Sequence, residues 1–125
     1  MVQNRNVSRV SVKIIVDGKG EAKGELIRFF APRSVDAILR ALPVEGRAMP
    51  FNSGVYFEMP LKLGREKAVQ TVEMGTIAYW PLASALCIFF DKSKPDKVVN
   101  KVGRIINNPS IFRKVGNGTR ISIKK

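Results

Sequence analysis

Cys87 is the one cysteine of the chain, and the sequence contains no histidine. A serine or cysteine nucleophile therefore cannot be activated by an imidazole, and no imidazole can shuttle a proton or bind a metal ion. A lone thiol can form neither an internal disulfide nor a thiolate zinc site. The chemistry left to the chain is binding through cations, aromatic rings and apolar surface.

Two further patterns carry no catalytic signal. Residues 18–24 are rich in glycine but lack the order of a phosphate-binding loop and the Ser or Thr that completes it, so they are interpreted as a hairpin turn. Glu58, Glu66 and Glu73 are scattered along the chain, and no metal or glycosidase pairing can be argued from them. We expect neither a metal ion nor another cofactor.

The charge of the chain is strongly basic and uneven. Lys and Arg total 22 against 10 acids, which gives a net charge of +12. Residues 92–125 contain ten of the basic residues and one acid, Asp96. Such a segment is typical of a solvated basic surface, and it also raises the hypothesis of nucleic-acid binding.

The length of 125 residues, with 45% hydrophobic and 26% charged residues, predicts one globular domain over residues 1–125. Residues 1–5 lack the apolar segment of a signal peptide. The longest uncharged stretch, residues 74–90, is short and is interrupted by Gly75, Pro81 and Ser84, so no membrane span is expected. We expect a cytoplasmic protein, which suits a free thiol.

Short segments with strand periodicity dominate the chain. Residues 9–16 alternate, with Val10, Val12, Ile14 and Val16 on one face, and Asp17-Gly18 predicts a turn into a second strand at 21–29. Residues 76–80 and 86–90 are apolar on both faces, which indicates the most buried strands. Other strands are expected at 44–51, 55–59, 69–72, 103–106 and 120–124.

One helix is predicted over residues 34–42. Val35, Ile38, Leu39 and Leu42 fall at helical spacing, Ser34 is the expected N-cap, and Pro43 ends the helix. One helical turn is expected at 110–115. The fold class is therefore mainly β: a closed eight-stranded antiparallel barrel with one main helix and short helical turns, because closure removes exposed strand edges.

Several segments carry a resemblance to a known family. ELIRFFAP at residues 25–32, with the helix after it, resembles the second strand and first helix of cyclophilins. GTIAYWP at 75–81 and ALCIFF at 85–90 resemble their glycine-led strand and phenylalanine-pair strand. With VYF at 55–57 and GRI at 103–105, the chain is most similar to small prokaryotic cyclophilin-like domains, over residues 9–124.

The resemblance implies a site on the outside of the barrel. Arg47 lies on the strand after the helix, where the family arginine sits, and is the candidate catalytic residue. Prolyl isomerisation needs no nucleophile: an apolar pocket with one donor aimed at the amide can lower the barrier of about 20 kcal/mol by differential binding. The candidate ligand-binding residues are Arg47, Phe51, Tyr56, Trp80 and Phe89.

The sequence departs from cyclophilins in two places. No glutamine follows Phe51 in the segment that would line the groove, and the chain between Phe90 and Val98 is too short for the helix region that contributes a tryptophan and a histidine. These departures imply that isomerase activity is weak or absent.

Three hypotheses remain. The chain binds a small molecule or a proline-containing peptide segment in a groove; it is a reduced peptidyl-prolyl isomerase; or it binds nucleic acid through residues 92–125. Phe112 is the only aromatic residue in that basic segment, which disfavours recognition of single strands by base stacking.

Overall fold

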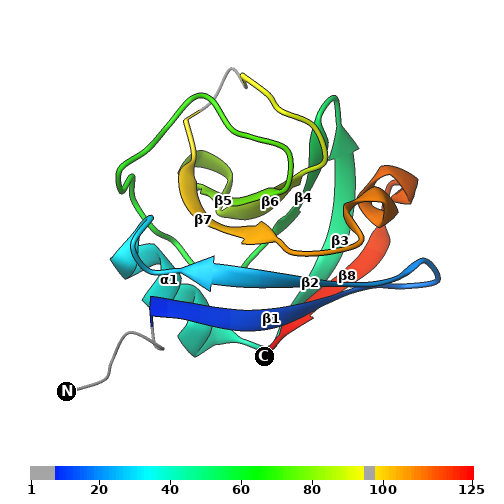
Figure 1. Cartoon of the computed structure of the whole chain (residues 1–125), viewed down its shortest axis with the longest axis horizontal. Coiled ribbons are helices and arrows are strands. Elements are labelled where there is room, and N and C mark those ends of the chain that lie inside the picture. Colours follow the sequence, from blue (N-terminus) through cyan, green and yellow to red (C-terminus); the bar gives the residue numbers. More distant parts are fainter. Residues whose placement is uncertain (1–7, 95–97) are drawn as a thin grey trace.

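The computed structural model describes residues 8–94 and 98–125 (Figure 1). Two expectations from the sequence fall wholly or partly outside these ranges: the absence of a signal peptide at residues 1–5, and the absence of a helix region between Phe90 and Val98. All eight strands and the main helix lie within the described residues.

Eight antiparallel strands close into one barrel, so the predicted fold class is confirmed. Around the barrel the strands follow the order β1-β2-β7-β5-β6-β4-β3-β8, and β8 pairs with β1 to complete the ring. The first two strands form the predicted hairpin, with Val12 opposite Gly24. The strands are β1 (Arg9–Val16), β2 (Gly20–Ile27), β3 (Val44–Phe51), β4 (Gly54–Glu58), β5 (Thr76–Trp80), β6 (Ala85–Phe89), β7 (Asn100–Ile105) and β8 (Thr119–Lys124).

Helical segments cover the openings of the barrel. Helix α1 (Pro32–Ala41) contributes Val35, Ile38 and Leu39 to the core, and the 3-10 helix η3 (Pro109–Lys114) contributes Ile111 and Phe112. Figure 1 shows the two segments on opposite sides of the barrel. A second 3-10 helix, η2 (Pro81–Ala83), joins β5 to β6.

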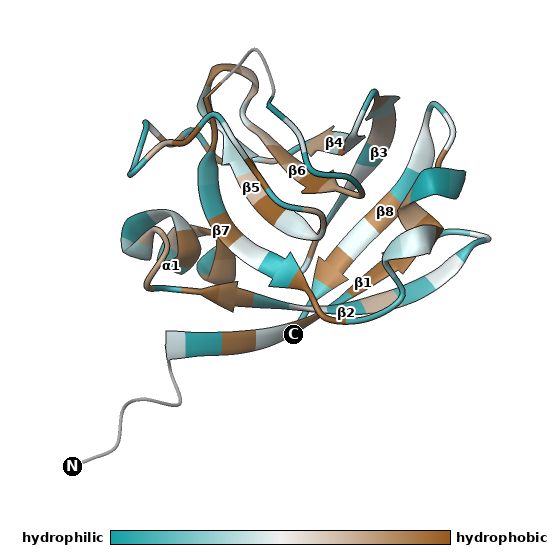
Figure 2. Ribbon diagram, turned by 45° about the horizontal axis from the view of Figure 1, so that its top comes forward, coloured by the Kyte–Doolittle hydropathy of each residue, from teal (hydrophilic) through white to brown (hydrophobic). Residues whose placement is uncertain are grey.

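The side chains form two apolar clusters, one on each side of the β5–β6 sheet. Ile77, Tyr79, Leu86 and Ile88 point into the barrel and join the main core. The alternate residues of these strands, Ala78, Cys87 and Phe89, form a second, outer cluster together with Val72 and Val99. This alternation follows from the two-residue period of a strand. Figure 2 colours β6 in shades of brown, because the residues on both of its faces are apolar. The two-sided burial predicted for both strands is confirmed.

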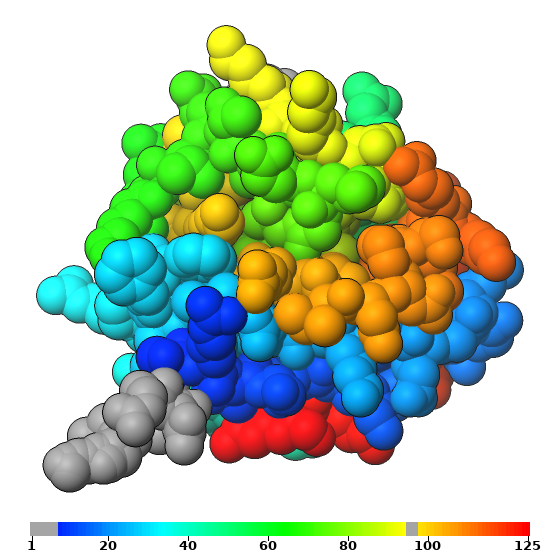
Figure 3. All heavy atoms as spheres, viewed as in Figure 1, coloured from blue at the N-terminus to red at the C-terminus, as the bar shows by residue number. Residues whose placement is uncertain are grey.

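The connection between β4 and β5, residues 59–75, is the cover of the outer cluster. Figure 3 shows its atoms in green at the surface of the molecule. The expected strand at residues 69–72 is wrong: Val69 and Val72 form only isolated bridges, with Val99 and Ser93. Both side chains pack against the outer cluster instead, so their apolar character reflects that burial and not a regular strand.

Buried polar side chains hold this connection in place. Tyr79, fully buried, donates through its hydroxyl to the Leu61 carbonyl (2.7 Å) and accepts from the Leu63 amide (3.1 Å). Asn100, also fully buried, accepts from the Glu66 amide (2.8 Å) and donates to the Gly64 carbonyl (2.8 Å). Irregular backbone can pack against the barrel here because its polar groups find partners.

Glu66 also caps helix α1 from outside the helix. Its carboxylate accepts from the backbone amides of Arg33 (3.0 Å) and Ser34 (2.8 Å) and from the Ser34 hydroxyl (2.8 Å). Pro32 has no amide hydrogen, so these bonds satisfy the donors left at the helix start. The prediction that Ser34 is the N-cap is wrong: the cap position is Ala31, and Ser34 lies in the first turn, where it accepts from Asn100 (3.2 Å).

The first prediction concerns a close backbone contact between β2 and β7. A methyl group at Gly103 would collide with the Glu25 carbonyl oxygen. Gly103→Ala should therefore lower the free energy of unfolding by about 1–3 kcal/mol, because the two strands must separate to admit it. Urea unfolding measures the loss. The control is Gly64→Ala, where a methyl group meets nothing within 4 Å; equal stability of the two variants would contradict the packing described.

The second prediction concerns the carboxylate of Glu66. Burial alone would raise the pKa of Glu66, but the hydrogen bonds from Arg33 and Ser34, with the charge of Arg33, outweigh burial and lower that pKa below 4.5. At pH 7, Glu66→Gln should lower the free energy of unfolding by about 1–2 kcal/mol, since charge-assisted hydrogen bonds are lost.

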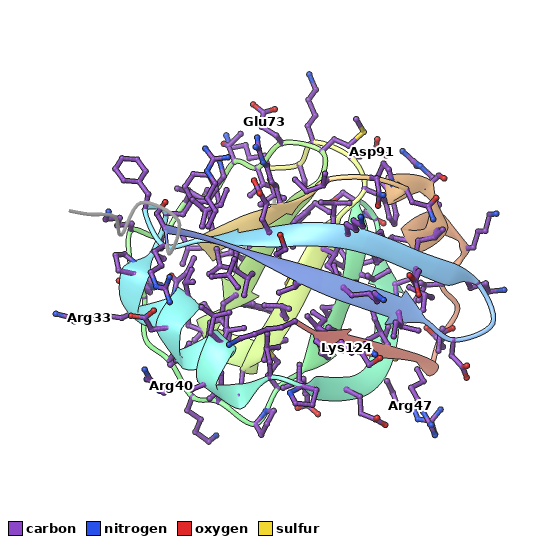
Figure 4. The ribbon with its side chains drawn as sticks, turned by 60° about the horizontal axis from the view of Figure 1, so that its bottom comes forward. Arg33, Arg40, Arg47, Glu73, Asp91 and Lys124 are labelled. Atoms are coloured by element: carbon purple, nitrogen blue, oxygen red, sulfur yellow. The ribbon has the colours of Figure 1, made fainter. Side chains whose placement is uncertain are left out.

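The sign of the pH dependence follows from the lowered pKa. The stabilisation by Glu66 is present above its unfolded pKa and is lost as the pH falls through the folded pKa, so the difference between wild type and Glu66→Gln should shrink below about pH 4.5. Glu73→Gln is the matched control, because Glu73 is an exposed glutamate of the same connection and lies far from α1 in Figure 4. A difference that persists at low pH would show that Glu66 acts through packing alone.

Candidate functional site

An open groove of about 1210 Å³ lies on the outside of the barrel. It begins where β3 and β4 part: their pairing covers Met49–Tyr56, Pro50–Val55 and Phe51–Gly54, and Arg47 lies beyond its end. The floor and walls come from β3, β4, the start of the 59–75 connection, the end of β5 and the η2 turn. The lining residues are Arg47, Met49, Tyr56, Phe57, Glu58, Met59, Pro60, Leu61, Lys62, Trp80, Leu82, Ala83 and Ser84.

Arg47 is an exposed cation in the middle of β3, and Figure 4 shows its side chain at the edge of the molecule. Its Nη1 donates to the Gly118 carbonyl (3.2 Å), which fixes one side of the guanidinium. It stands directly opposite Arg120 in the β3–β8 register, and Arg120 is paired with Glu45 (3.7 Å). Within the described residues no carboxylate forms an ion pair with Arg47. Its charge is therefore available to a ligand.

A chain of aromatic rings runs from the outer cluster to the groove. Phe89 and Phe51 meet edge to face (5.5 Å between centroids, 85°), Phe51 lies 6.1 Å from Tyr56, and Tyr56 meets Trp80 edge to face (5.7 Å, 81°). Such geometries are favourable beyond simple area burial. The rings support one another, so the two that line the groove are held in fixed orientations.

The five residues predicted for the site lie in one region, but only three of them line the groove. Arg47, Tyr56 and Trp80 line the groove together. Phe51 and Phe89 lie behind it, and Phe89 is fully buried in the outer cluster. The two-residue period correctly predicts that Phe89 lies on the outer face. Phe89 is nevertheless buried, because the 59–75 connection covers this part of the face.

Sequence reasoning missed the flexible apolar residues of the groove, Met49, Met59 and Leu82. Met49 and Leu82 are exposed by 38% and 83%. A signal for Met49 was present, because it lies two residues after Arg47 on the same strand and must share its face. Leu82 follows Trp80-Pro81 in a turn, where no periodicity predicts its direction.

The basic segment 92–125 is distributed over several parts of the barrel. Arg104 pairs with Glu25 (3.1 Å), Arg113 with Asp91 (2.8 Å), and Arg120 with Glu45. Lys101 lies over the ring of Phe30, 4.4 Å from its centroid. Lys97 is outside the described residues. Within the described residues, three of these cations are therefore paired with acids, and they lie on three different elements: β7, η3 and β8.

The described residues offer neither a metal cluster nor a membrane-spanning helix. Residues 8–94 and 98–125 hold no group of three or more His, Cys, Asp or Glu side chains placed to bind a metal ion. Within the same ranges, no helix has the length and apolar character that crossing a bilayer requires.

The closed antiparallel barrel, with α1 at one opening and an aromatic groove on its wall, defines a cyclophilin-like domain. The model of the Cyclophilin-like family matches residues 10–124, and the chain belongs to this family. The resemblance found in the sequence is therefore confirmed for family and fold.

Several solved structures resemble the barrel, including the following two. A hypothetical protein from Archaeoglobus fulgidus, solved in solution, is 29% identical, with 94% of this chain and 95% of that chain covered and a TM-score of 0.77. The structure of McbB in complex with tryptophan is 12% identical with a TM-score of 0.77; the match covers 91% of this chain and 44% of McbB, and it shows the fold alone. A comparison with curated proteins gave no match.

Proposed function

We propose that this cyclophilin-like domain binds a peptide segment or small molecule in the groove beside Arg47. The observation that carries the proposal is the convergence of Arg47, Tyr56 and Trp80 on one concavity from three strands. Apolar walls with a few placed polar groups are the usual make-up of ligand sites. The ligand therefore combines an apolar or aromatic group with an oxygen acceptor.

The charges of the groove favour an anionic or carbonyl oxygen. Arg47 and Lys62 line it, against one carboxylate, Glu58. One side of the Arg47 guanidinium is already held by the Gly118 carbonyl. Its remaining donors can therefore bind a carboxylate or a peptide carbonyl with little further loss of side-chain entropy. A ligand carboxylate would gain from the net positive charge as well as from the hydrogen bonds.

The apolar rim suits side chains of varied shape. Met49 is unbranched and adaptable, and Leu82 is almost fully exposed on the η2 turn, whereas Met59 lines the groove from the buried core. The rings of Tyr56 and Trp80, which meet edge to face, provide a rigid surface next to them. A proline ring or an aromatic side chain flanked by a carbonyl fits this arrangement.

The third prediction uses Trp80 as a reporter, because it is the one tryptophan of the chain and lines the groove. Titration with a succinylated Ala-Ala-Pro-Phe peptide should change its fluorescence with saturation, since the peptide supplies a carboxylate, a proline and an aromatic ring. Arg47→Gln should weaken the affinity about tenfold, the loss expected for one charge-assisted hydrogen bond.

Arg120→Gln is the matched control for this titration. Arg120 is the neighbouring cation on the same outer face, directly opposite Arg47, but it does not line the groove. Its loss should leave the affinity within about twofold of wild type, because its charge is screened by solvent. Absence of saturable binding, or equal weakening by both variants, would reject the groove as the site.

The alternative within the same groove is a reduced prolyl isomerase, which the arginine beside an apolar wall favours. The fourth prediction is that a protease-coupled assay on the proline peptide, at micromolar protein, gives a rate within about twofold of the uncatalysed rate. Binding alone does not accelerate rotation unless the twisted amide is bound more tightly than the planar one. A clear acceleration that Arg47→Gln abolishes would establish the isomerase instead.

A further inference from the structure

A second pocket, of about 600 Å³, lies between α1 and the start of β1. It is lined by Arg9, Val10, Ser11, Arg28, Asp36, Leu39, Arg40 and Lys125. It shares no lining residue with the groove at Arg47, and Figure 4 shows Arg40 and Arg47 at separate places on the molecule. Whatever this pocket does is therefore independent of the groove.

The side chains of this pocket carry an excess of positive charge. Four of them are cationic, Arg9, Arg28, Arg40 and Lys125, and one is a carboxylate, Asp36. The three arginines come from β1, from the turn after β2, and from the last turn of α1, so the fold gathers them from distant parts of the sequence. Several cations around one concavity favour a bound anion.

The existing partners satisfy these arginines only in part. Arg9 donates to Glu25 (3.2 Å), a carboxylate that also accepts from Arg104. Arg28 is bound to Asp36 through Nε (2.6 Å), while its Nη1 is buried and has no hydrogen-bond partner within the described structure. Arg40 forms no hydrogen bond or ion pair with the described residues. The Arg28 side chain as a whole is 31% exposed, but its buried Nη1 donor still lacks an acceptor.

We propose that this pocket binds the phosphate group of a small molecule. Guanidinium groups present planar forks of donors that match phosphate oxygens, and several of them around one concavity favour a dianion over a single carboxylate. The volume is in the range of ligand pockets and exceeds that of a bare phosphate, so a phosphate monoester or a pyrophosphate fits it. The Ser11 side chain on the same wall is a further donor.

The phosphate could also belong to a polynucleotide, and the charge distinguishes the two sources. A phosphate monoester or pyrophosphate presents a dianionic end that can enter a pocket, whereas each phosphodiester of a nucleic acid carries one charge and is flanked by sugars. The pocket geometry favours the small dianion. Titration calorimetry of the full chain with pyrophosphate is the test, with sulfate and an oligothymidine lacking a terminal phosphate as comparisons at the same ionic strength.

Arg40→Gln is the decisive variant, and Arg33→Gln is its matched control. Both arginines project from α1 (Figure 4), but only Arg40 lines the pocket. Pyrophosphate should bind wild type and Arg33→Gln alike, and Arg40→Gln about tenfold more weakly. Asp36→Asn should bind more tightly, because the one carboxylate of the pocket is removed. Arg40 also balances the C-terminal dipole of α1, so the unfolding midpoint of each variant without ligand is measured to separate binding from stability.

The outcomes divide cleanly. Saturable pyrophosphate binding that depends on Arg40 supports the proposal. No binding of pyrophosphate, equal affinity in Arg40→Gln and wild type, or binding of the oligothymidine alone would overturn it. None of these results bears on the groove at Arg47, since the two sites share no residue.

Discussion

The fixed position of the 59–75 connection is the constraint on which the outer surface of this barrel depends. No regular element spans these residues. Besides the backbone bridges at Val69 and Val72, three side chains hold the segment: the Tyr79 hydroxyl, the Asn100 amide and the Glu66 carboxylate. Two of them belong to barrel strands and are fully buried, where an unsatisfied polar group would be costly. Each hydrogen bond therefore both satisfies a buried group and orders the segment above it.

The groove follows from that constraint. Met59 to Lys62 form one of its walls, and Leu61 is the residue whose carbonyl Tyr79 binds. Further along, Val69 and Val72 cover Phe89 and so close the back of the aromatic chain that ends at Trp80. Arg47 is placed independently, by β3–β8 pairing and the Gly118 carbonyl. The site thus combines one wall set by sheet pairing with one set by buried polar anchors.

Sequence periodicity correctly predicted most of the strands and their buried faces, because these depend on neighbouring residues in the chain. The alternation in residues 9–16 identified β1 and its buried face, and the apolar runs at 76–80 and 86–90 identified the two strands buried on both sides. Ser34 as the N-cap was wrong, because the cap is supplied by Glu66 from 32 residues away along the chain. The same distance explains why Glu66 looked like a scattered acid. Its role depends on which loop the closed barrel brings to the start of α1, and no local signal carries that information.

The distribution of charge also differs between the sequence and the surface: cations that are close in the chain are separated on the barrel, and distant ones are brought together. The cations of residues 92–125 are dense in the sequence, yet β7 and β8 are not neighbours: β7 lies between β2 and β5, and β8 between β1 and β3. Barrel closure therefore separates Arg104 from Arg120 and gives each an acidic partner. The opposite happens at α1 and β1, where Arg9, Arg28 and Arg40 are far apart in the sequence but line one pocket. In a closed barrel, the strand order and not the local density of basic residues decides where an anion finds several cations at once.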